Sequence, residues 1–220
     1  MKIPFNRLDL QFFMYQDEYE RKALEVLRSG WYILGKEVEE FEKEFSKYIG
    51  SEYTIGLASG LDALVIAFRA LDIKEGDEII VQANTYIASV MGITMNGATP
   101  IFVEPDNFFN IDAKKIEGKI TSKTKAILVT HLYGQSSNMG EILKICKKYK
   151  LKLVEDCAQS HGAKFNNKMT GTFGDISTFS FYPAHHITMG EGGAVLINNP
   201  VLSKLAESFR AGRKDTVIDE

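Results

Sequence analysis

Two histidines stand where an alternating apolar run gives way to a glycine-rich loop. The run spans 176–182, Pro183 follows it, and His185 and His186 precede a second apolar run at 194–197. Because proline has no N–H for a ladder, the pattern predicts a strand, a tight turn and another strand. Open α/β sheets carry their chemistry at strand ends, which makes His185 the first residue to explain.

A serine–glycine turn before an Ala- and Leu-rich helix is the second candidate. Ser59, Gly60 and Leu61 would begin that helix. The first turn of a helix has free N–H groups and the positive end of the dipole, which suits a phosphate, although Ser59 could equally be only a cap. The turn is neither a P-loop nor a dinucleotide fingerprint, because the Gly-Lys-Ser/Thr and Gly-x-Gly-x-x-Gly patterns are missing.

Other strand ends carry polar or aromatic side chains. Asp156 could cap the loop that follows it, or face a cation such as a protonated pyridine nitrogen or a metal. Gln159 and His161 could continue the same wall. Tyr86 could stack on a flat ring or be a core aromatic on a helix. The stretch 131–134 has the same ambiguity.

The sequence predicts neither a metal centre nor a serine hydrolase. His185, His186 and Glu191 are close in sequence, but adjacent histidines point in different directions, and no spaced set of ligands completes a coordination shell. A catalytic serine would need a Gly-x-Ser-x-Gly elbow, and none occurs.

Alternating strands and helices must position these groups. The pattern predicts one amphipathic helix from Asp17, as its cap, to about Ser29, and a second that Gly50 closes; residues 1–16 are predicted to be irregular. Strands are expected at 53–57, 78–82, 99–104, 126–130, 151–155, 176–181 and 194–197, and helices at about 60–71, 85–96, 138–149 and 201–211. This order predicts an α/β fold with a seven-stranded, mainly parallel sheet between helices, whose strand ends meet at one edge.

Composition narrows the class of protein. The 220 residues are 45% hydrophobic and 25% charged, with a net charge of −3, so the chain can bury a core and is a poor candidate for nucleic-acid binding. The 2 cysteines form no disulfide framework and indicate a reducing compartment. No apolar run reaches transmembrane length and no signal-peptide core is present, so we expect a cytoplasmic protein that binds no membrane.

An ordered series of motifs resembles the first part of the DegT/StrS sugar aminotransferases, pyridoxal-phosphate (PLP) enzymes of the aspartate aminotransferase fold. The most specific stretches are Glu155-Asp-Cys-Ala-Gln-Ser-His-Gly162 and Phe179-Ser-Phe-Tyr182, and others lie at 35–42, 58–60, 76–80, 84–86, 131–134 and 171–175. The resemblance implies the large domain of a fold-type I PLP enzyme. Residues 1–35 would be an N-terminal arm and helix, residues 36–220 the PLP-binding domain, and the family's small C-terminal domain would be absent.

The resemblance also implies a role for each matching position. Ser59, the backbone of Gly60 and Leu61, and Ser180 would hold the cofactor phosphate. The ring of Tyr86 would stack on the pyridine. Asp156 would pair with the pyridinium nitrogen and keep it protonated, so that the ring can accept electrons, and Gln159 would contact the ring hydroxyl.

One position departs from the aminotransferase pattern. Enzymes of this family carry a lysine five residues after the serine that matches Ser180, and this chain has His185 there. Imidazole has no primary amine and cannot form the lysine's covalent link to the cofactor, but it can move protons near neutral pH. The segment 181–193 resembles the family's dehydratases, which remove the C3 hydroxyl of nucleotide-linked 4-keto-6-deoxyhexoses. His185 would then take a proton from the C4′ carbon of the amine cofactor (PMP) while that hydroxyl leaves as water.

The expected function is therefore C3 dehydration in deoxysugar biosynthesis, with glutamate as the possible amino donor. Two alternatives stay open: a nucleotide-sugar transaminase, and a truncated or chimeric chain of this fold without activity. One dehydratase branch also holds an iron–sulfur cluster, but its four thiolates cannot come from 2 cysteines, so no cluster is expected. The resemblance further implies a homodimer.

Overall fold

The computed structural model describes residue 4 and residues 6–212, and the chain divides into two compact units between Phe41 and Glu42. The first unit contains the helices α1 (Leu8–Met14) and α2 (Gln16–Ser29) and the start of α3 (Lys36–Ile49). No residue of α1 or α2 is buried. The second unit holds the rest of α3 and all the strands.

Two predictions for the first unit are wrong. Helix α1 lies where an irregular segment was expected, and its N-cap residue, Arg7, makes no side-chain capping hydrogen bond. Helix α2 begins at Gln16 with Tyr15 at the N-cap, so Asp17 is not the cap. Its carboxylate instead lies in the first turn, where negative charge interacts favourably with the helix dipole. Gly30 ends α2 in the left-handed conformation, as a C-terminal glycine does.

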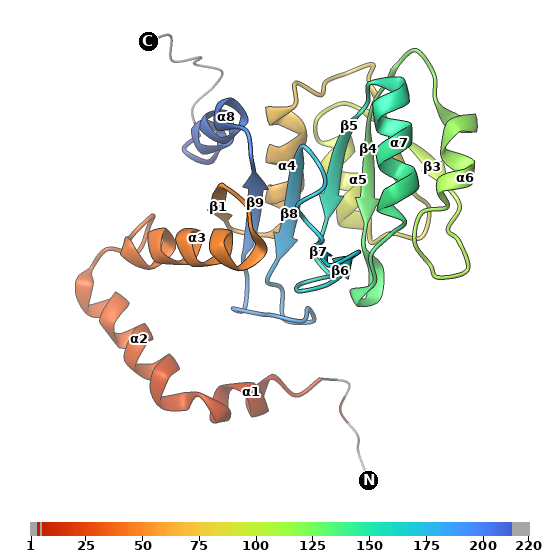
Figure 1. Ribbon diagram of the computed structural model, residues 1–220. Coiled ribbons are helices and arrows are strands. Elements are labelled where there is room, and N and C mark those ends of the chain that lie inside the picture. Colours follow the sequence, from red (N-terminus) through yellow and green to blue (C-terminus); the bar gives the residue numbers. More distant parts are fainter. Residues whose placement is uncertain (1–3, 5, 213–220) are drawn as a thin grey trace. The chain divides into compact units, whose positions relative to one another are not determined.

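The second unit is built on the predicted seven-stranded sheet (Figure 1). Its order is β1-β9-β8-β5-β4-β2-β3; β9 runs antiparallel to β1 and β8, and the other neighbouring strands are parallel. The fold prediction is confirmed. The strands are β1 (Tyr53–Leu57), β2 (Glu78–Gln82), β3 (Thr99–Val103), β4 (Thr124–Thr130), β5 (Lys152–Asp156), β8 (Ile176–Ser180) and β9 (Gly193–Ile197).

Helices cover both faces of this sheet. Alternate residues of β2 show why, since Ile79 and Val81 belong to one buried cluster and Ile80 to the other. The first cluster packs under α4 (Gly60–Ala70), α5 (Ile87–Thr94) and α8 (Pro200–Arg210), and the second under α6 (Ala113–Ile116) and α7 (Met139–Tyr149). In Figure 1, α7 lies in front of the strands and α5 behind them. Strands buried on both faces are the near-continuous apolar runs that parallel sheets require.

Short elements complete the second unit. A hairpin of β6 (Lys164–Phe165) and β7 (Lys168–Met169), not predicted, turns at Asn166 and Asn167, both with positive φ. The 3₁₀ turns are η1 (Glu117–Lys119) and η2 (Leu132–Gly134). Across the described part of the chain, no helix has the length and apolar character needed to cross a membrane.

Candidate active site

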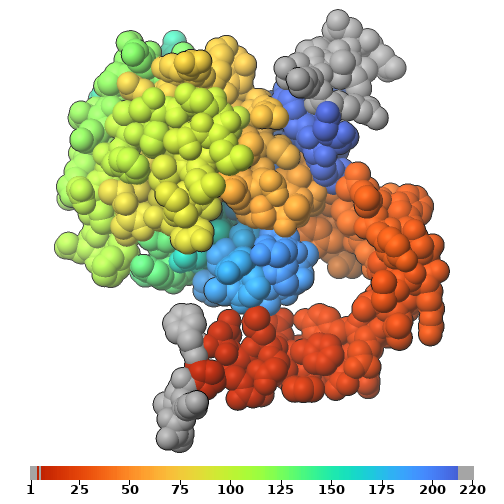
Figure 2. Space-filling model, turned by 180° about the vertical axis from the view of Figure 1, so that it is seen from behind, coloured from red at the N-terminus to blue at the C-terminus, as the bar shows by residue number. Residues whose placement is uncertain are grey.

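A cavity of about 500 Å³ opens at the carboxyl ends of the parallel strands in the second unit. The residues to which a cofactor or catalytic role was assigned all line it: Ser59, Gly60, Leu61, Tyr86, Asp156, Gln159, Ser180 and His185. They come from distant parts of the sequence and meet because the strand ends share one edge. In Figure 2, the light-blue surface of the segment after β8 borders the yellow surface around α5.

One part of the cavity is a tight backbone cradle at the start of α4. Ser59 is the N-cap of this helix, and its hydroxyl accepts from the N–H of Asp62 at 3.1 Å. A Cβ on Gly60 would lie 2.6 Å from the Cβ of Ser180, and one on Gly193 would collide with the backbone oxygen of Ser59. Only glycine allows these segments to approach so closely.

This cradle has the chemistry of an anion site. The N–H groups of the first helical turn lack intrahelical acceptors, and the dipole adds positive potential. The hydroxyl of Ser59 currently donates to Oδ2 of Asp62 at 2.8 Å. A phosphate would take that hydrogen bond only if the hydroxyl turned away from Asp62. With this adjustment, Ser59, Gly60, Leu61 and Ser180 can hold a phosphate group.

Another part of the cavity holds the carboxylate of Asp156, at the end of β5. Its Oδ2 accepts from the hydroxyl of Ser89 at 2.8 Å, and its Oδ1 accepts from the N–H of Ala158 at 3.1 Å. Asp156 is 5% exposed. Burial raises the pKa of its carboxyl, against the opposite effect of these hydrogen bonds and of nearby His131 and His185. A cation placed in the cavity would favour the ionised form.

Tyr86 and Gln159 both line the cavity, but the Tyr86 ring is exposed whereas the Gln159 side chain is hydrogen-bonded. Tyr86 is 71% exposed and occupies the N-cap position of α5, so it is not a core aromatic and its ring is free to cover a flat ligand. Gln159 holds the neighbouring η2 turn: its side-chain oxygen accepts from the N–H of Tyr133 at 3.1 Å, and its backbone oxygen accepts from Gly134. Tyr133 has φ of 57°, a left-handed conformation that these bonds stabilise.

His185 lies on the loop after β8, and its backbone N–H donates to the oxygen of Tyr182. Burial lowers the pKa of its imidazole, and the carboxylates of Asp156 and Glu191 oppose that effect. The imidazole therefore favours its neutral form, which can accept a proton. No lysine occurs among the described residues that line the cavity.

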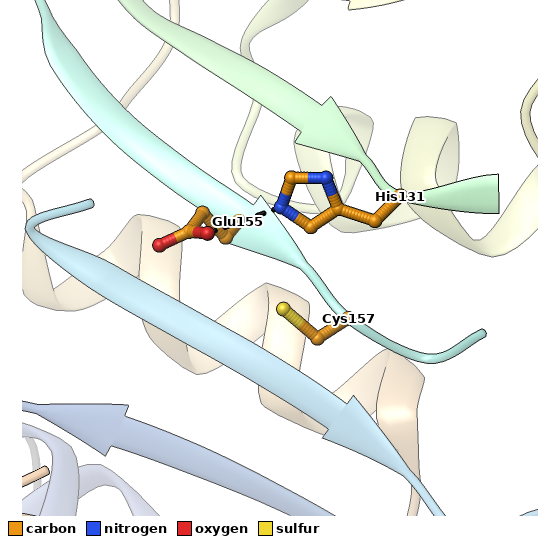
Figure 3. Close-up of side chains that lie close together, drawn as sticks. All are labelled: His131, Glu155 and Cys157. Carbon is orange, nitrogen blue, oxygen red and sulfur yellow. Dashed lines mark hydrogen bonds and ion pairs between the residues drawn. The ribbon is translucent and has the colours of Figure 1, made fainter. Parts of the chain in front are cut away.

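His131, from the ambiguous stretch at 131–134, pairs with Glu155 of β5, and both side chains are buried (Figure 3). Because successive residues of a strand alternate between its faces, Glu155 faces away from Asp156 and the cavity. Nε2 of His131 donates to Glu155 at 3.0 Å, and Nδ1 accepts from the N–H of Ser137 at 3.1 Å. Glu155 also accepts from three backbone N–H groups, those of Gly171, Phe173 and Gly174. Burial alone would raise the pKa of Glu155, but the interaction with His131 and the hydrogen bonds from Gly171 and Gly174 outweigh burial, so this pKa is lowered.

Cys157 lies beside this pair, and the three side chains could in principle meet around a metal. The chemistry does not favour it. Both nitrogens of His131 and both oxygens of Glu155 already have hydrogen-bond partners. Burial raises the pKa of the Cys157 thiol well above its usual range, whereas a metal needs the thiolate. Glu155, which His131 holds, instead anchors the loop 171–174.

The hydroxyl groups behind Asp156 are not predicted from the sequence. Ser89 and Thr130 line the cavity, and Thr85 lies between their hydroxyl groups. Serine and threonine occur throughout the chain, so nothing in the sequence distinguishes them. His161, which was expected to continue the wall, is not among the lining residues. Its ring packs between Phe179 and Phe181, and burial lowers the pKa of its imidazole to about 4.

The fold and site define a class of PLP-type enzyme domain, and comparison with known proteins supplies its family. The model of the DegT/DnrJ/EryC1/StrS aminotransferase family matches residues 14–216. The chain belongs to this family, as its motifs indicated.

Individual relatives give the likeness in more detail. The chain is 54% identical over 210 residues to the dTDP-3-amino-3,6-dideoxy-alpha-D-galactopyranose transaminase of Aneurinibacillus thermoaerophilus, covering 94% of this chain and 58% of the relative. The S. venezuelae DesV structure in complex with a ketimine intermediate superposes with a TM-score of 0.94 at 37% identity, over 99% of this chain and 59% of DesV.

A dehydratase structure is also similar. GDP-4-keto-6-deoxymannose-3-dehydratase with a trapped PLP-glutamate geminal diamine gives a TM-score of 0.83 at 35% identity, over 87% of this chain and 52% of that enzyme. The chain thus spans between half and three fifths of the length of these proteins.

Proposed function

We propose that this chain is the cofactor-binding part of a PLP/PMP-dependent enzyme that acts on a nucleotide-linked keto-deoxysugar. The observation that carries the proposal is the single cavity in which the backbone cradle of α4 and the buried carboxylate of Asp156 both lie. A phosphate and a protonated ring nitrogen are the two ends of PLP that need such groups.

The residues present fit this cofactor. Glycine at positions 60 and 193 leaves room at the cradle that a Cβ would fill. When bound, the cofactor supplies an electron-accepting ring that stabilises negative charge on a carbon that has lost a proton. Asp156 would keep the ring nitrogen protonated, Tyr86 would cover the ring, and Gln159 would orient its hydroxyl side. His185 would hold and move the proton.

Amino transfer is the reaction that the relatives support best. The relative that is 54% identical is a nucleotide-sugar transaminase, whereas the dehydratase enters only as a similar structure. The dehydration expected from the sequence is therefore the less supported of the two reactions. In amino transfer, glutamate would supply the amino group and His185 would move the proton in both directions.

Dehydration is retained as a second candidate because of His185. Imidazole cannot form the covalent link that a lysine amine makes with the cofactor, and the described lining of the cavity offers no lysine instead. A base that removes a proton without replacing it favours loss of a hydroxyl group from the sugar.

One experiment tests both reactions. The protein is loaded with PLP, glutamate is added, and the absorbance is followed for conversion of the aldehyde form to the amine form. A panel of GDP-, CDP- and dTDP-linked 4-keto-6-deoxyhexoses is then supplied, and the products are analysed by mass spectrometry. A sugar that gains nitrogen indicates amino transfer, and one that loses its C3 oxygen indicates dehydration. H185N is the control that should block proton transfer while binding the cofactor.

An absence of any spectral change with PLP and glutamate would contradict the proposal. It would favour a chain that keeps the fold without activity. The division into an arm at 1–35 and a PLP domain at 36–220, the homodimer and the cytoplasmic location all stay predictions, which sedimentation and cell fractionation can check.

A further inference from the structure

Three hydroxyl groups lie in a row behind the carboxylate of Asp156. The hydroxyl of Thr130 is 3.1 Å from that of Thr85, which is 2.7 Å from that of Ser89, whose hydroxyl donates to Oδ2 of Asp156 at 2.8 Å. They come from three separate segments: the end of β4, the connection after β2, and α5. Thr130 and Asp156 are also register partners on adjacent strands.

The direction of these hydrogen bonds follows from proton counting. An ionised carboxylate only accepts, so the single hydrogen of Ser89 points at Asp156. Ser89 must then accept from Thr85, which uses the only hydrogen of Thr85. Thr85 must in turn accept from Thr130. Every hydrogen in the row therefore points towards the carboxylate.

We propose that Thr130, Thr85 and Ser89 form a one-way chain of hydrogen bonds that holds Asp156 in its ionised form, ready for a cationic ring. Ser89 and Thr130 are buried at 1% and 3% exposure, where hydrogen bonds in a row polarise and strengthen one another. The three are positioning residues, since they act through Asp156. Their effect on cofactor affinity rests on the proposed function, but their effect on Asp156 does not.

The direction of this row of hydrogen bonds depends on the protonation state of Asp156. If Oδ2 of Asp156 gains a proton on the side that faces Ser89, Ser89 can no longer donate to it. The whole row then has to reverse, with the hydrogen of Thr130 turned away from Thr85. A proton on Oδ1 leaves the row in place but removes the charge that strengthens the bond from Ser89. Protonation therefore either reverses the row or weakens its last hydrogen bond, and both oppose the effect of burial on the pKa of Asp156. His131 and His185 are the titratable groups that also act on Asp156, and both lower its pKa.

Matched substitutions test the row of hydroxyl hydrogen bonds in the cofactor-free protein. Carbon-13 NMR follows the titration of the Asp156 carboxyl, which D156N assigns, and a fluorescence titration gives the Kd for PMP. S89A should move the carboxyl midpoint to higher pH and raise Kd about tenfold, as expected for loss of a hydrogen bond to a charge. T85V removes a hydroxyl but keeps the shape, so it should move both quantities in the same direction by less. T85S keeps the hydroxyl and should match the wild type.

T94V is the control on the same helix, because the exposed Thr94 donates only to the backbone oxygen of Met91. The proposal is overturned if S89A and T85V leave the carboxyl titration unchanged, or if T85S shifts it as much as T85V, since packing would then be the cause. A wild-type protein that binds no PMP would contradict the proposed function, while the carboxyl titration would still test the hydroxyl chain.

Discussion

Glu155 and Asp156 are adjacent carboxylates on β5 that face opposite sides of the sheet and have opposite surroundings. Glu155 accepts hydrogen bonds from His131 and from three backbone N–H groups of the loop 171–174. Asp156 accepts one from a side chain and one from the backbone, and it borders the cavity. Burial acts on both, yet the pKa is lowered for Glu155 and raised for Asp156.

This difference in hydrogen-bond partners distinguishes a carboxylate that stabilises the fold from one that can bind a ligand. A carboxylate whose oxygens are fully engaged stabilises the fold and has nothing left for a ligand. A buried carboxylate with fewer partners is destabilising until a cation arrives, which is the condition expected of a binding group. Three experiments can break or sharpen this contrast.

The largest effect is expected from E155Q. The amide replaces one accepting oxygen with an N–H₂ group that faces backbone donors, so buried N–H groups lose their acceptor. We expect the free energy of unfolding to fall by about 3–5 kcal/mol, as for a buried charge network that loses one partner. Urea denaturation followed by circular dichroism measures it. A loss below about 1 kcal/mol would mean that Glu155 does not anchor the loop.

D156N should have the opposite profile. Removing a buried, incompletely paired charge leaves the unfolding free energy unchanged or raises it, because the desolvation penalty disappears. Affinity for PMP should fall about 10- to 100-fold, since a charge-assisted hydrogen bond is lost. Calorimetric titration with PMP measures the affinity. If D156N instead lowers stability as E155Q does, the two carboxylates are not functionally different.

The smallest effect is the dependence of these differences on pH. The stabilisation from Glu155, whose folded pKa is lowered, is present above its unfolded pKa of about 4.3 and is lost as the pH falls through the folded value. For Asp156, whose folded pKa is raised, stabilisation is full below about 3.9 and is lost as the pH rises through the folded value. Relative to the wild type, the E155Q deficit should therefore shrink in acid, and the D156N advantage should appear only as the pH rises. Unfolding curves between about pH 3 and 7 should show these opposite slopes; parallel slopes would contradict the assignment.

The sheet could be predicted because its signal is local. Runs such as 78–82 and 194–197 are apolar, β-branched and bounded by turn residues, and the strands lie within two residues of their predicted positions. Helix α1 was missed because no capping residue precedes it. The Asn166-Asn167 hairpin had a usable signal, since two asparagines in a two-residue loop tolerate positive φ.

The site was predictable only as a set. Each candidate residue was ambiguous by itself, and the shared edge of a parallel sheet is what predicts that Ser59, Asp156 and His185 meet. The sequence could not predict that Glu155 has a structural role and Asp156 a binding role. The difference depends on which N–H groups of the distant loop 171–174 reach the oxygens of Glu155. The hydroxyls of Thr85 and Ser89 acquire their role in the same way, through tertiary contacts.

The strand order has a consequence for co-translational folding. Among the described strands of this sheet, β1 comes first in the sequence and pairs with β9, where Tyr53 is the register partner of Ile197. The cradle likewise needs Gly193 against Ser59. Closing so long a loop is slow compared with local folding. The nascent chain therefore cannot complete this cradle until β9 has been translated, so capture of a phosphate-bearing cofactor would report the pairing of β1 with β9.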